Sequence, residues 1–137
     1  LRFAHTGSEV LVKEYQIAPK ELPILDAEKT NFKEIITTLE DYKLGFVFFE
    51  KQGKFYGVCS NADLRKGIIN HLNNLNDINV EELINSKPFS ISENISTSEM
   101  ISAIKTKNFP ILFLPVLADD KTISGALTFN QLIKGEA

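Results

Sequence analysis

Two stretches of the chain have nearly the same sequence. The first runs from Gly57 to Gly67 and the second from Gly125 to Gly135. Each is a glycine, an apolar pair, a Ser or Thr, three further residues, and then Leu, any residue, Lys and Gly. An internal repeat indicates that the fold contains one supersecondary unit twice. Two copies of a strand-to-helix turn also predict two equivalent clefts, which favours binding over chemistry.

The repeat extends backwards to a helix start in each copy. Asn31 and Ser96 are good N-caps, and Glu34 and Glu99 follow three residues later, as a capping box requires. Behind each cap lies an apolar face with helical spacing. The faces are Phe32, Ile35, Ile36 and Leu39 in the first copy, and Met100, Ile101 and Ile104 in the second.

The rest of each copy predicts strands and hairpin turns. Apolar runs at 46–49 and 111–114 follow the helices. Polar turns at 51–54 and 119–122 then separate them from strands at 55–60 and 122–127. A short helix is expected to start near Asn61 or Phe129. Each copy is therefore predicted to be strand, helix, strand, strand, helix, which is an α+β fold.

Length and composition limit what the chain can be. Its 137 residues, 43% of them hydrophobic, suit one compact domain or two small interlocked ones. Each copy alone is too small to bury its apolar faces well, so we expect the copies to pack as a pseudo-two-fold pair. A net charge of −3 without a basic stripe argues against nucleic acid. The apolar runs are too short for a membrane span.

The same analysis predicts the compartment and the domain boundaries. A single cysteine excludes an internal disulfide and fits a reducing cytoplasm. No signal-peptide pattern is present at Leu1, and we expect a piece of a longer protein. The predicted divisions are an approach segment at 1–21, a first motif at 22–69, a linker at 70–87 and a second motif at 88–137. Within the linker we expect a polar loop at 70–77 and a short helix at 80–84.

These features resemble a pair of CBS motifs, often called a Bateman module. The resemblance covers roughly Val12 to Gly135, and it is strongest at 57–65, 80–100 and 125–132. More narrowly, Ser60-Asn61-Ala62-Asp63-Leu64-Arg65-Lys66 is similar to the Thr-Asp-Gly-Asp-Leu-Arg-Arg segment in the CBS tail of bacterial D-arabinose 5-phosphate isomerases. Those enzymes serve capsule and Kdo (lipopolysaccharide) biosynthesis. Glu21-Leu22-Pro23-Ile24 lies where that family has Glu-Leu-Pro-Val.

This resemblance implies a regulatory tail whose catalytic partner is a tethered N-terminal sugar-isomerase (SIS) domain. A sugar-phosphate nucleotidyltransferase family carries a similar CBS pair and is the alternative parent. The segment itself shows no combination of nucleophile, base and oxyanion-stabilising residues, so we expect no catalytic residue in it.

The resemblance implies that Ser60 and Asp63 hold ribose hydroxyls and phosphate. A carboxylate accepts two hydroxyl hydrogen bonds, and the start of a helix favours a phosphate. The other interpretation is that Ser60 is an N-cap with Asp63 in the first turn. Arg65 could reach a phosphate or be a solvated surface residue. In the second copy Thr128 remains, but Gln131 replaces the acid, so that site is expected to be empty, altered or purely structural.

Other reactive residues have simpler interpretations. His5 and His71 lack ligand spacing and are expected at the surface, while Cys59 is expected in the core. Asp119-Asp120 is interpreted as a turn, and no metal site is expected.

The sequence therefore predicts a regulatory module without a resident cofactor, whose possible ligand is an adenine or cytidine nucleotide. Self-association as a homodimer or a larger assembly is expected, with the crowded aromatic residues at 46–56 supplying core and surface. The alternative is a ligand-free dimerisation scaffold.

Overall fold

The structure of the protein is a computed structural model, and it describes residues 10–129. The chain divides into two units. Unit 2 is residues 22–88, and the described part of unit 1 is residues 10–21 together with 89–129. The leading residues of the chain therefore belong to the unit that its second half forms.

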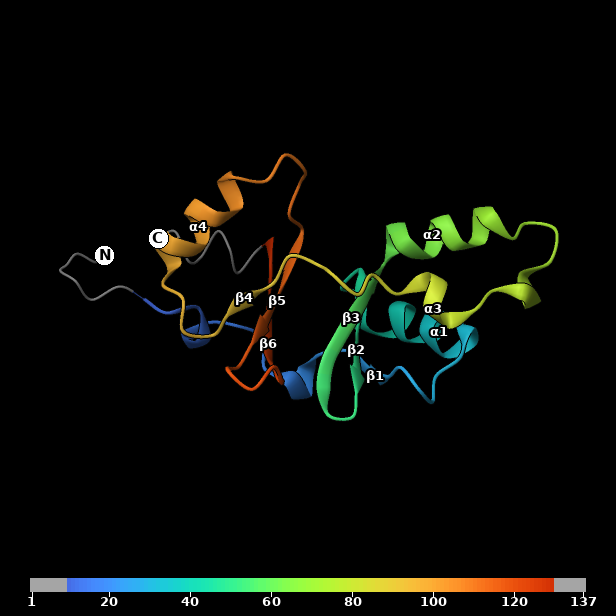
Figure 1. The fold of residues 1–137 in the computed structure, drawn as a ribbon, viewed down its shortest axis with the longest axis horizontal. Coiled ribbons are helices and arrows are strands. Elements are labelled where there is room, and N and C mark those ends of the chain that lie inside the picture. Colours follow the sequence, from blue (N-terminus) through green and yellow to red (C-terminus); the bar gives the residue numbers. More distant parts are fainter. Residues whose placement is uncertain (1–9, 130–137) are drawn as a thin grey trace. The chain divides into compact units, whose positions relative to one another are not determined.

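Unit 2 is a three-stranded sheet with helices α1 and α2 side by side (Figure 1). The sheet order is β1-β2-β3, in which β1 is parallel and β3 antiparallel to the central β2. Its elements are β1 (Ile24–Asp26), α1 (Phe32–Tyr42), β2 (Phe46–Lys51), β3 (Lys54–Ser60), α2 (Asn61–Asn70), the 3-10 turn η3 (Leu75–Asp77) and α3 (Val80–Leu83).

Unit 1 repeats this arrangement. Its sheet has the order β4-β5-β6, again with one parallel and one antiparallel pair. Its elements are the 3-10 turns η1 (Val12–Glu14) and η2 (Pro19–Glu21), β4 (Ile91–Ser92), α4 (Thr97–Lys105), β5 (Phe113–Leu117) and β6 (Ile123–Thr128). The predicted α+β repeat is confirmed up to Thr128, and the second copy's last helix lies outside the described residues.

Each unit has its own hydrophobic core, to which its sheet and its first helix contribute. In unit 2, the buried residues Ile35, Leu39, Val47, Phe49, Cys59 and Leu83 form one cluster. In unit 1, the cluster is Val12, Ile91, Met100, Leu114, Val116 and Leu127. Val12 and Leu83 come from the segments that precede β1 and β4. Each core is therefore completed by the leading segment of the opposite half of the sequence.

Local signals explain the helix starts. Asn31 Oδ1 accepts the Glu34 N–H at 2.8 Å, and Ser96 forms a full capping box with Glu99. The expected box at Asn31 is wrong in one detail, because the Glu34 carboxylate accepts the Thr30 hydroxyl at 2.7 Å instead. The hairpin at Gln52-Gly53 is confirmed, and both residues have positive φ, 54° and 79°. Such a turn matches the twist of the strands it joins.

The strands predicted at 55–60 and 122–127 are each displaced by one residue at one or both ends, and three other predictions are wrong. The run 111–114 becomes a strand only from Phe113 onward, because the ladder begins opposite Thr128, where β6 ends. The expected loop at 70–77 contains η3, which Asn74 caps by accepting the Asn76 N–H. The linker helix ends at Leu83 rather than 84.

Two neighbouring glutamates of α3, Glu81 and Glu82, hydrogen-bond to other elements of unit 2. Glu82 Oε2 accepts the Asn79 N–H at 3.0 Å, and Glu82 Oε1 lies 2.7 Å from His71 Nε2 at the end of α2. Beside it, the Tyr56 hydroxyl donates to Glu81 at 2.7 Å. The expected surface residue His71 thus has a specific partner, and its side chain is only 23% exposed.

These contacts predict a stability that depends on pH. The hydrogen bond from His71, and then that from the Asn79 backbone, lower the pKa of Glu82. A lowered pKa in the folded state gives stability that is present above the ordinary value, about 4.3, and is lost as pH falls through the folded value. We expect Glu82→Gln to unfold more easily than wild type at pH 6, measured by urea denaturation. The difference should shrink below pH 4, and a constant difference across that range would contradict the assignment.

Candidate functional site

The candidate site lies where β3 passes into α2. Ser60 ends the strand and is the N-cap of the helix, with extended φ and ψ of −91° and 170°. Its hydroxyl accepts the Asp63 N–H at 3.1 Å. Asp63 Oδ2 in turn accepts both the Ser60 N–H and the Ser60 hydroxyl at 2.9 Å. The helix-cap interpretation of these residues is therefore confirmed, and their ligand role stays a prediction.

The capping box leaves part of Asp63 available. Both of its side-chain hydrogen bonds go to Oδ2, and among residues 10–129 none reaches Oδ1. Asp63 is partly exposed. A carboxylate oxygen in this position can accept a hydroxyl hydrogen bond from a ligand while its neighbour keeps the helix capped.

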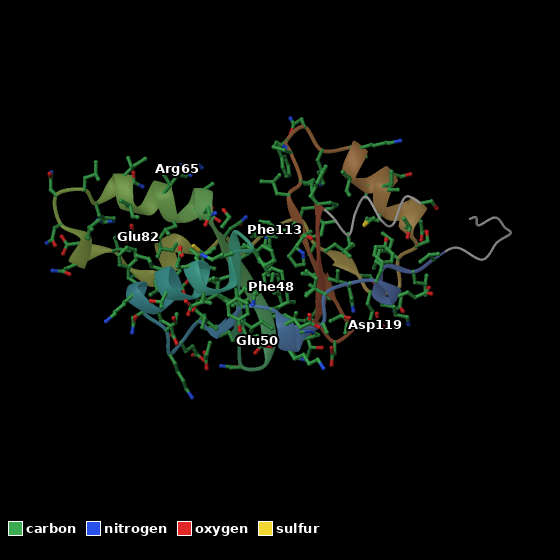
Figure 2. The ribbon with its side chains drawn as sticks, turned by 180° about the vertical axis from the view of Figure 1, so that it is seen from behind. Phe48, Glu50, Arg65, Glu82, Phe113 and Asp119 are labelled. Atoms are coloured by element: carbon green, nitrogen blue, oxygen red, sulfur yellow. The ribbon has the colours of Figure 1, made fainter. Side chains whose placement is uncertain are left out.

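The other two predicted site residues lie in different places. Arg65 is exposed on α2 (Figure 2), in keeping with a solvated side chain. Thr128 is the last residue of β6 in unit 1, half-buried and paired with Phe113. Gln131 lies outside the described residues. Within unit 2 the structure therefore brings Ser60 and Asp63 together, with Arg65 two residues further along the same helix.

Unit 1 contains a second capping box with the same geometry. Ser96 caps α4, and its N–H and hydroxyl donate to Glu99 Oε1 at 3.1 and 3.0 Å. The Glu99 N–H donates back to the Ser96 hydroxyl at 3.2 Å. This box lies at the first helix of its repeat rather than after the hairpin. It provides a matched comparison for the Ser60–Asp63 box.

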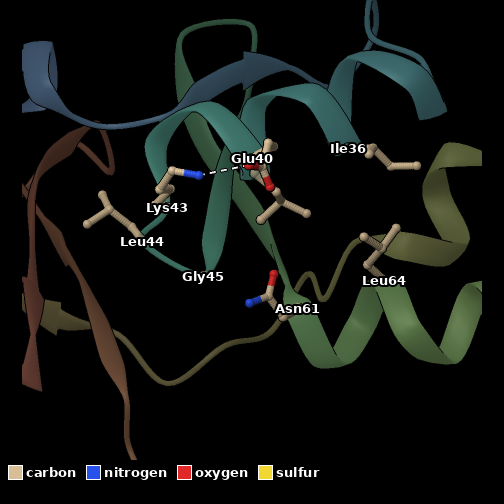
Figure 3. A pocket seen from close by; sticks show the side chains of 8 residues that line it. Ile36, Glu40, Lys43, Leu44, Gly45, Asn61 and Leu64 are labelled. Carbon is tan, nitrogen blue, oxygen red and sulfur yellow. Dashed lines mark hydrogen bonds and ion pairs between the residues drawn. The ribbon is translucent and has the colours of Figure 1, made fainter.

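A hollow of about 430 Å³ lies beside the capping box in unit 2. Figure 3 shows it between α1 and α2, with Ile36 of α1 and Leu64 of α2 on opposite sides. Its other lining residues are Leu39, Glu40, Lys43, Leu44, Gly45 and Asn61. Neither Ser60 nor Asp63 lines it, so the hollow and the predicted ligand residues are neighbours rather than one site.

Sequence reasoning missed this hollow, although one signal for it exists. Helix α1 ends with Lys43 in the left-handed region at a φ of 56°, and Gly45 follows with a φ of 86°. These two residues turn the chain sharply into β2, and the Gly45 carbonyl accepts the Asn61 N–H at 3.0 Å. The Lys43 ammonium pairs with Glu40 at 2.7 Å at the rim. A Lys-x-Gly ending after an amphipathic helix would have indicated the turn.

Cys59 carries the single thiol of the chain. Cys59 is buried, and burial and then the Asp63 charge raise its thiol pKa to about 12, so it is a poor nucleophile.

Between residues 10 and 129, no three His, Cys, Asp or Glu side chains gather as a metal site would need. In the same part of the chain, no helix has the length and apolar character needed to cross a membrane.

The fold resembles solved structures of CBS-domain pairs. CBSX2, a CBS-pair protein from Arabidopsis thaliana, is 15% identical, with a TM-score of 0.75 over 94% of this chain and 95% of that one. A structure of CBSX2 in complex with AMP is 18% identical and has a TM-score of 0.76 over 93% and 96%. The CBS domain pair of protein MJ0100, in complex with 5-methylthioadenosine and S-adenosyl-L-methionine, is 18% identical and has a TM-score of 0.74 over 94% and 99%.

A transporter domain has the same fold. The CBS domain of a bacterial CNNM/CorC family Mg2+ transporter is 14% identical, with a TM-score of 0.72 over 92% of this chain and 74% of that one. The sequence matches no protein-family profile and no curated protein. At these identities the likeness concerns the fold alone. The chain has the fold of a CBS-domain pair.

Proposed function

We propose that this chain is a regulatory module that binds an adenine or cytidine nucleotide and controls an enzyme to which it is tethered. The observation that carries the proposal is the Ser60–Asp63 box, which presents an unengaged carboxylate oxygen at the first turn of α2. Two proteins of the same fold have been solved as complexes, one with AMP and one with 5-methylthioadenosine and S-adenosyl-L-methionine. All three ligands contain adenosine.

The chemistry of this turn suits a ribose phosphate. Asp63 Oδ1 would accept the ribose hydroxyls, because the two lone-pair sites of Oδ2 already accept the Ser60 N–H and hydroxyl. The positive end of the α2 dipole favours a nearby phosphate, and Arg65 adds a flexible cation on the same helix. Thr128 would serve a second, weaker site. No residue in this arrangement distinguishes one base from another, so the ribose and phosphate define the ligand class.

Thermal melts with a nucleotide panel test this proposal. A nucleotide at a hundredfold excess over its Kd should add about 2.7 kcal/mol to the free energy of unfolding. Asp63→Ala should abolish that shift, because it removes the acceptor for the ribose. Asp63 also caps α2, so the variant should begin about 1 kcal/mol less stable even without nucleotide.

Glu99→Ala is the matched control for this loss of a cap. It removes from α4 the same two side-chain hydrogen bonds that Asp63→Ala removes from α2, and no proposed ligand contact. We expect it to be destabilised to a similar degree and to keep the full nucleotide shift. If Asp63→Ala responds like Glu99→Ala, the ribose is not held by Asp63. If no nucleotide stabilises the wild type, the module is not a sensor.

A dimerisation scaffold is the second candidate, and exposed apolar side chains favour it. Ile36 on α1 is 37% exposed, and Ile69 on α2 and Leu72 just after it are 59% and 69% exposed. Large apolar side chains left open to water often mark an association surface. We therefore also infer a homodimer or a larger assembly. Analytical ultracentrifugation at micromolar concentration tests the scaffold, because a monomer there would contradict it and leave the sensor.

We further propose that the parent protein is a cytoplasmic sugar-phosphate isomerase of the arabinose 5-phosphate type, with a tethered SIS domain and a role in capsule or lipopolysaccharide synthesis. The support is the resemblance of 60–66 and 21–24 to the tails of those enzymes. A nucleotidyltransferase parent is the alternative. An assay of the full-length parent for aldose–ketose interconversion of arabinose 5-phosphate, with and without nucleotide, separates the two.

A further inference from the structure

Each sheet pairs at one edge with a segment that leads into the opposite half of the repeat. In unit 1, Ile17 and Ala126 exchange two backbone hydrogen bonds of 2.8 and 3.1 Å. In unit 2, Asn85 and Val58 do the same at 2.7 and 3.0 Å. The segments 12–17 and 80–85 are therefore structural equivalents, each seated on its own sheet edge.

A glycine lies beneath each segment and shows which residues of the two segments are equivalent. A Cβ on Gly125 would lie 2.5 Å from the Ile17 carbonyl oxygen and 2.7 Å from Gln16 Cδ. A Cβ on Gly57 would lie 2.6 Å from both the Asn85 carbonyl oxygen and Ile84 Cγ2. Gln16 in unit 1 thus occupies the place of Ile84 in unit 2.

The surroundings of Gln16 form a polar relay. Gln16 Nε2 donates to the Ser124 hydroxyl at 2.9 Å and to the Ser124 carbonyl at 3.1 Å. The Ser124 hydroxyl donates to Glu93 Oε1 at 2.7 Å. All three residues are partly buried. We name this group the Gln16–Ser124–Glu93 relay.

The same three positions in unit 2 are Ala27, Ile84 and Tyr56, whose hydroxyl is directed to Glu81 instead. Tyr56 precedes Gly57 as Ser124 precedes Gly125. The Ala27 N–H donates to the end of β2 as the Glu93 N–H donates to the end of β5. Ala27, Tyr56 and Ile84 all pack against the unit 2 core. The fold therefore does not require such a relay at this edge.

The relay is also incomplete, because Gln16 Oε1 is buried and has no hydrogen-bond partner within the described residues. A buried acceptor without a partner is unfavourable, and an apolar replacement is often neutral or stabilising. The polar residues instead allow each sheet edge to discriminate between the segments 12–17 and 80–85. Gln16 placed against Tyr56 and Ala27 would lose its bond to the serine hydroxyl and keep only a backbone carbonyl as its acceptor. Ile84 placed against Ser124 would leave the Ser124 hydroxyl without the amide donor, and that hydroxyl would keep only its bond to Glu93.

We propose that the relay is a pairing code that directs segment 12–17 to β6 and excludes segment 80–85 from it. The partner that fits this sheet edge is a segment carrying a side-chain amide over Gly125. The edge of unit 2 has no serine hydroxyl to accept that amide. Because segments 12–17 and 80–85 are structural equivalents, each could otherwise dock on the sheet edge of the other, within one chain or between two copies. The code acts against this crossed docking.

A disulfide competition in the full chain tests this code. In a Cys59→Ala background, Ile17→Cys, Ala126→Cys and Val58→Cys are combined. Directly opposed antiparallel residues lie within disulfide reach, so position 17 can join either 126 or 58. The chain is refolded in a glutathione buffer, and the linked peptides are counted by mass spectrometry. We expect 17–126 to exceed 17–58 by about tenfold or more, because one unpaired buried group has that weight.

Adding Gln16→Ile, Ser124→Ala and Glu93→Ala together leaves this edge without the relay, as in unit 2. The ratio should then fall by about tenfold. Should this variant fail to fold, Ser124→Ala alone should lower the ratio by a smaller factor. Thr122→Val, which removes a hydroxyl bonded only to Asp120 in the adjacent turn, should leave the ratio unchanged. An unchanged ratio in the triple variant, or in Ser124→Ala where the triple variant is unfolded, would overturn the proposal.

Discussion

Phe49→Ala is expected to lower the free energy of unfolding by about 3–5 kcal/mol, the usual cost of removing a buried phenyl ring. Phe49 lies on the central strand β2 and is fully buried. Its ring belongs to the core that α1, β3 and α3 share. Across the ladder it faces Gly57, which has no side chain to close the space left behind.

Phe109→Ala is the control for this substitution. It removes the same ring from a site that is 52% exposed, and it should change stability by less than about 0.5 kcal/mol. Urea denaturation followed by circular dichroism measures both variants. A loss below about 1 kcal/mol for Phe49→Ala would mean that unit 2 does not depend on this core.

The elements that sequence predicted best are those with local causes. Ser60 and Ser96 cap helices because a side-chain oxygen three residues before a free N–H satisfies it. Gln52 and Gly53 turn the chain because both adopt positive φ. Such signals involve neighbours in sequence, so the repeat of strand, helix, strand and strand could be predicted with most of its boundaries.

The features that sequence did not predict depend on partners far apart in the chain. Nothing local indicates that Gln16 lies on Gly125, or that His71 pairs with Glu82. The docking of each leading segment depends on bridged residue pairs that lie far apart in the chain, such as Ile17 with Ala126 and Asn85 with Val58. At the site, the sequence placed Ser60 and Asp63 correctly at the start of α2. A capping role and a ligand role would both use these two residues. Only a ligand experiment can separate those two roles.

A side chain at Gly57 tests whether the leading segment 80–85 is part of unit 2 or only adjacent to it. The Cβ of Gly57→Ala would lie 2.6 Å from the Asn85 carbonyl oxygen, which is backbone and cannot rotate away. The segment must then lift from β3, and the two hydrogen bonds between Val58 and Asn85 weaken. We expect a loss of about 2–4 kcal/mol, combining overpacking with these bonds.

Gly67→Ala gives the contrasting case on the same unit. Its Cβ would meet the tip of Leu83, a side chain that can change rotamer, and alanine is favoured over glycine within a helix by about 1 kcal/mol. Gly67→Ala should therefore cost at least about 1 kcal/mol less than Gly57→Ala. Hydrogen exchange distinguishes the mechanisms. In Gly57→Ala the Asn85 and Val58 amides should lose protection together, whereas in Gly67→Ala they should keep it. Equal protection in both variants would show that segment 80–85 is not held by the edge of β3.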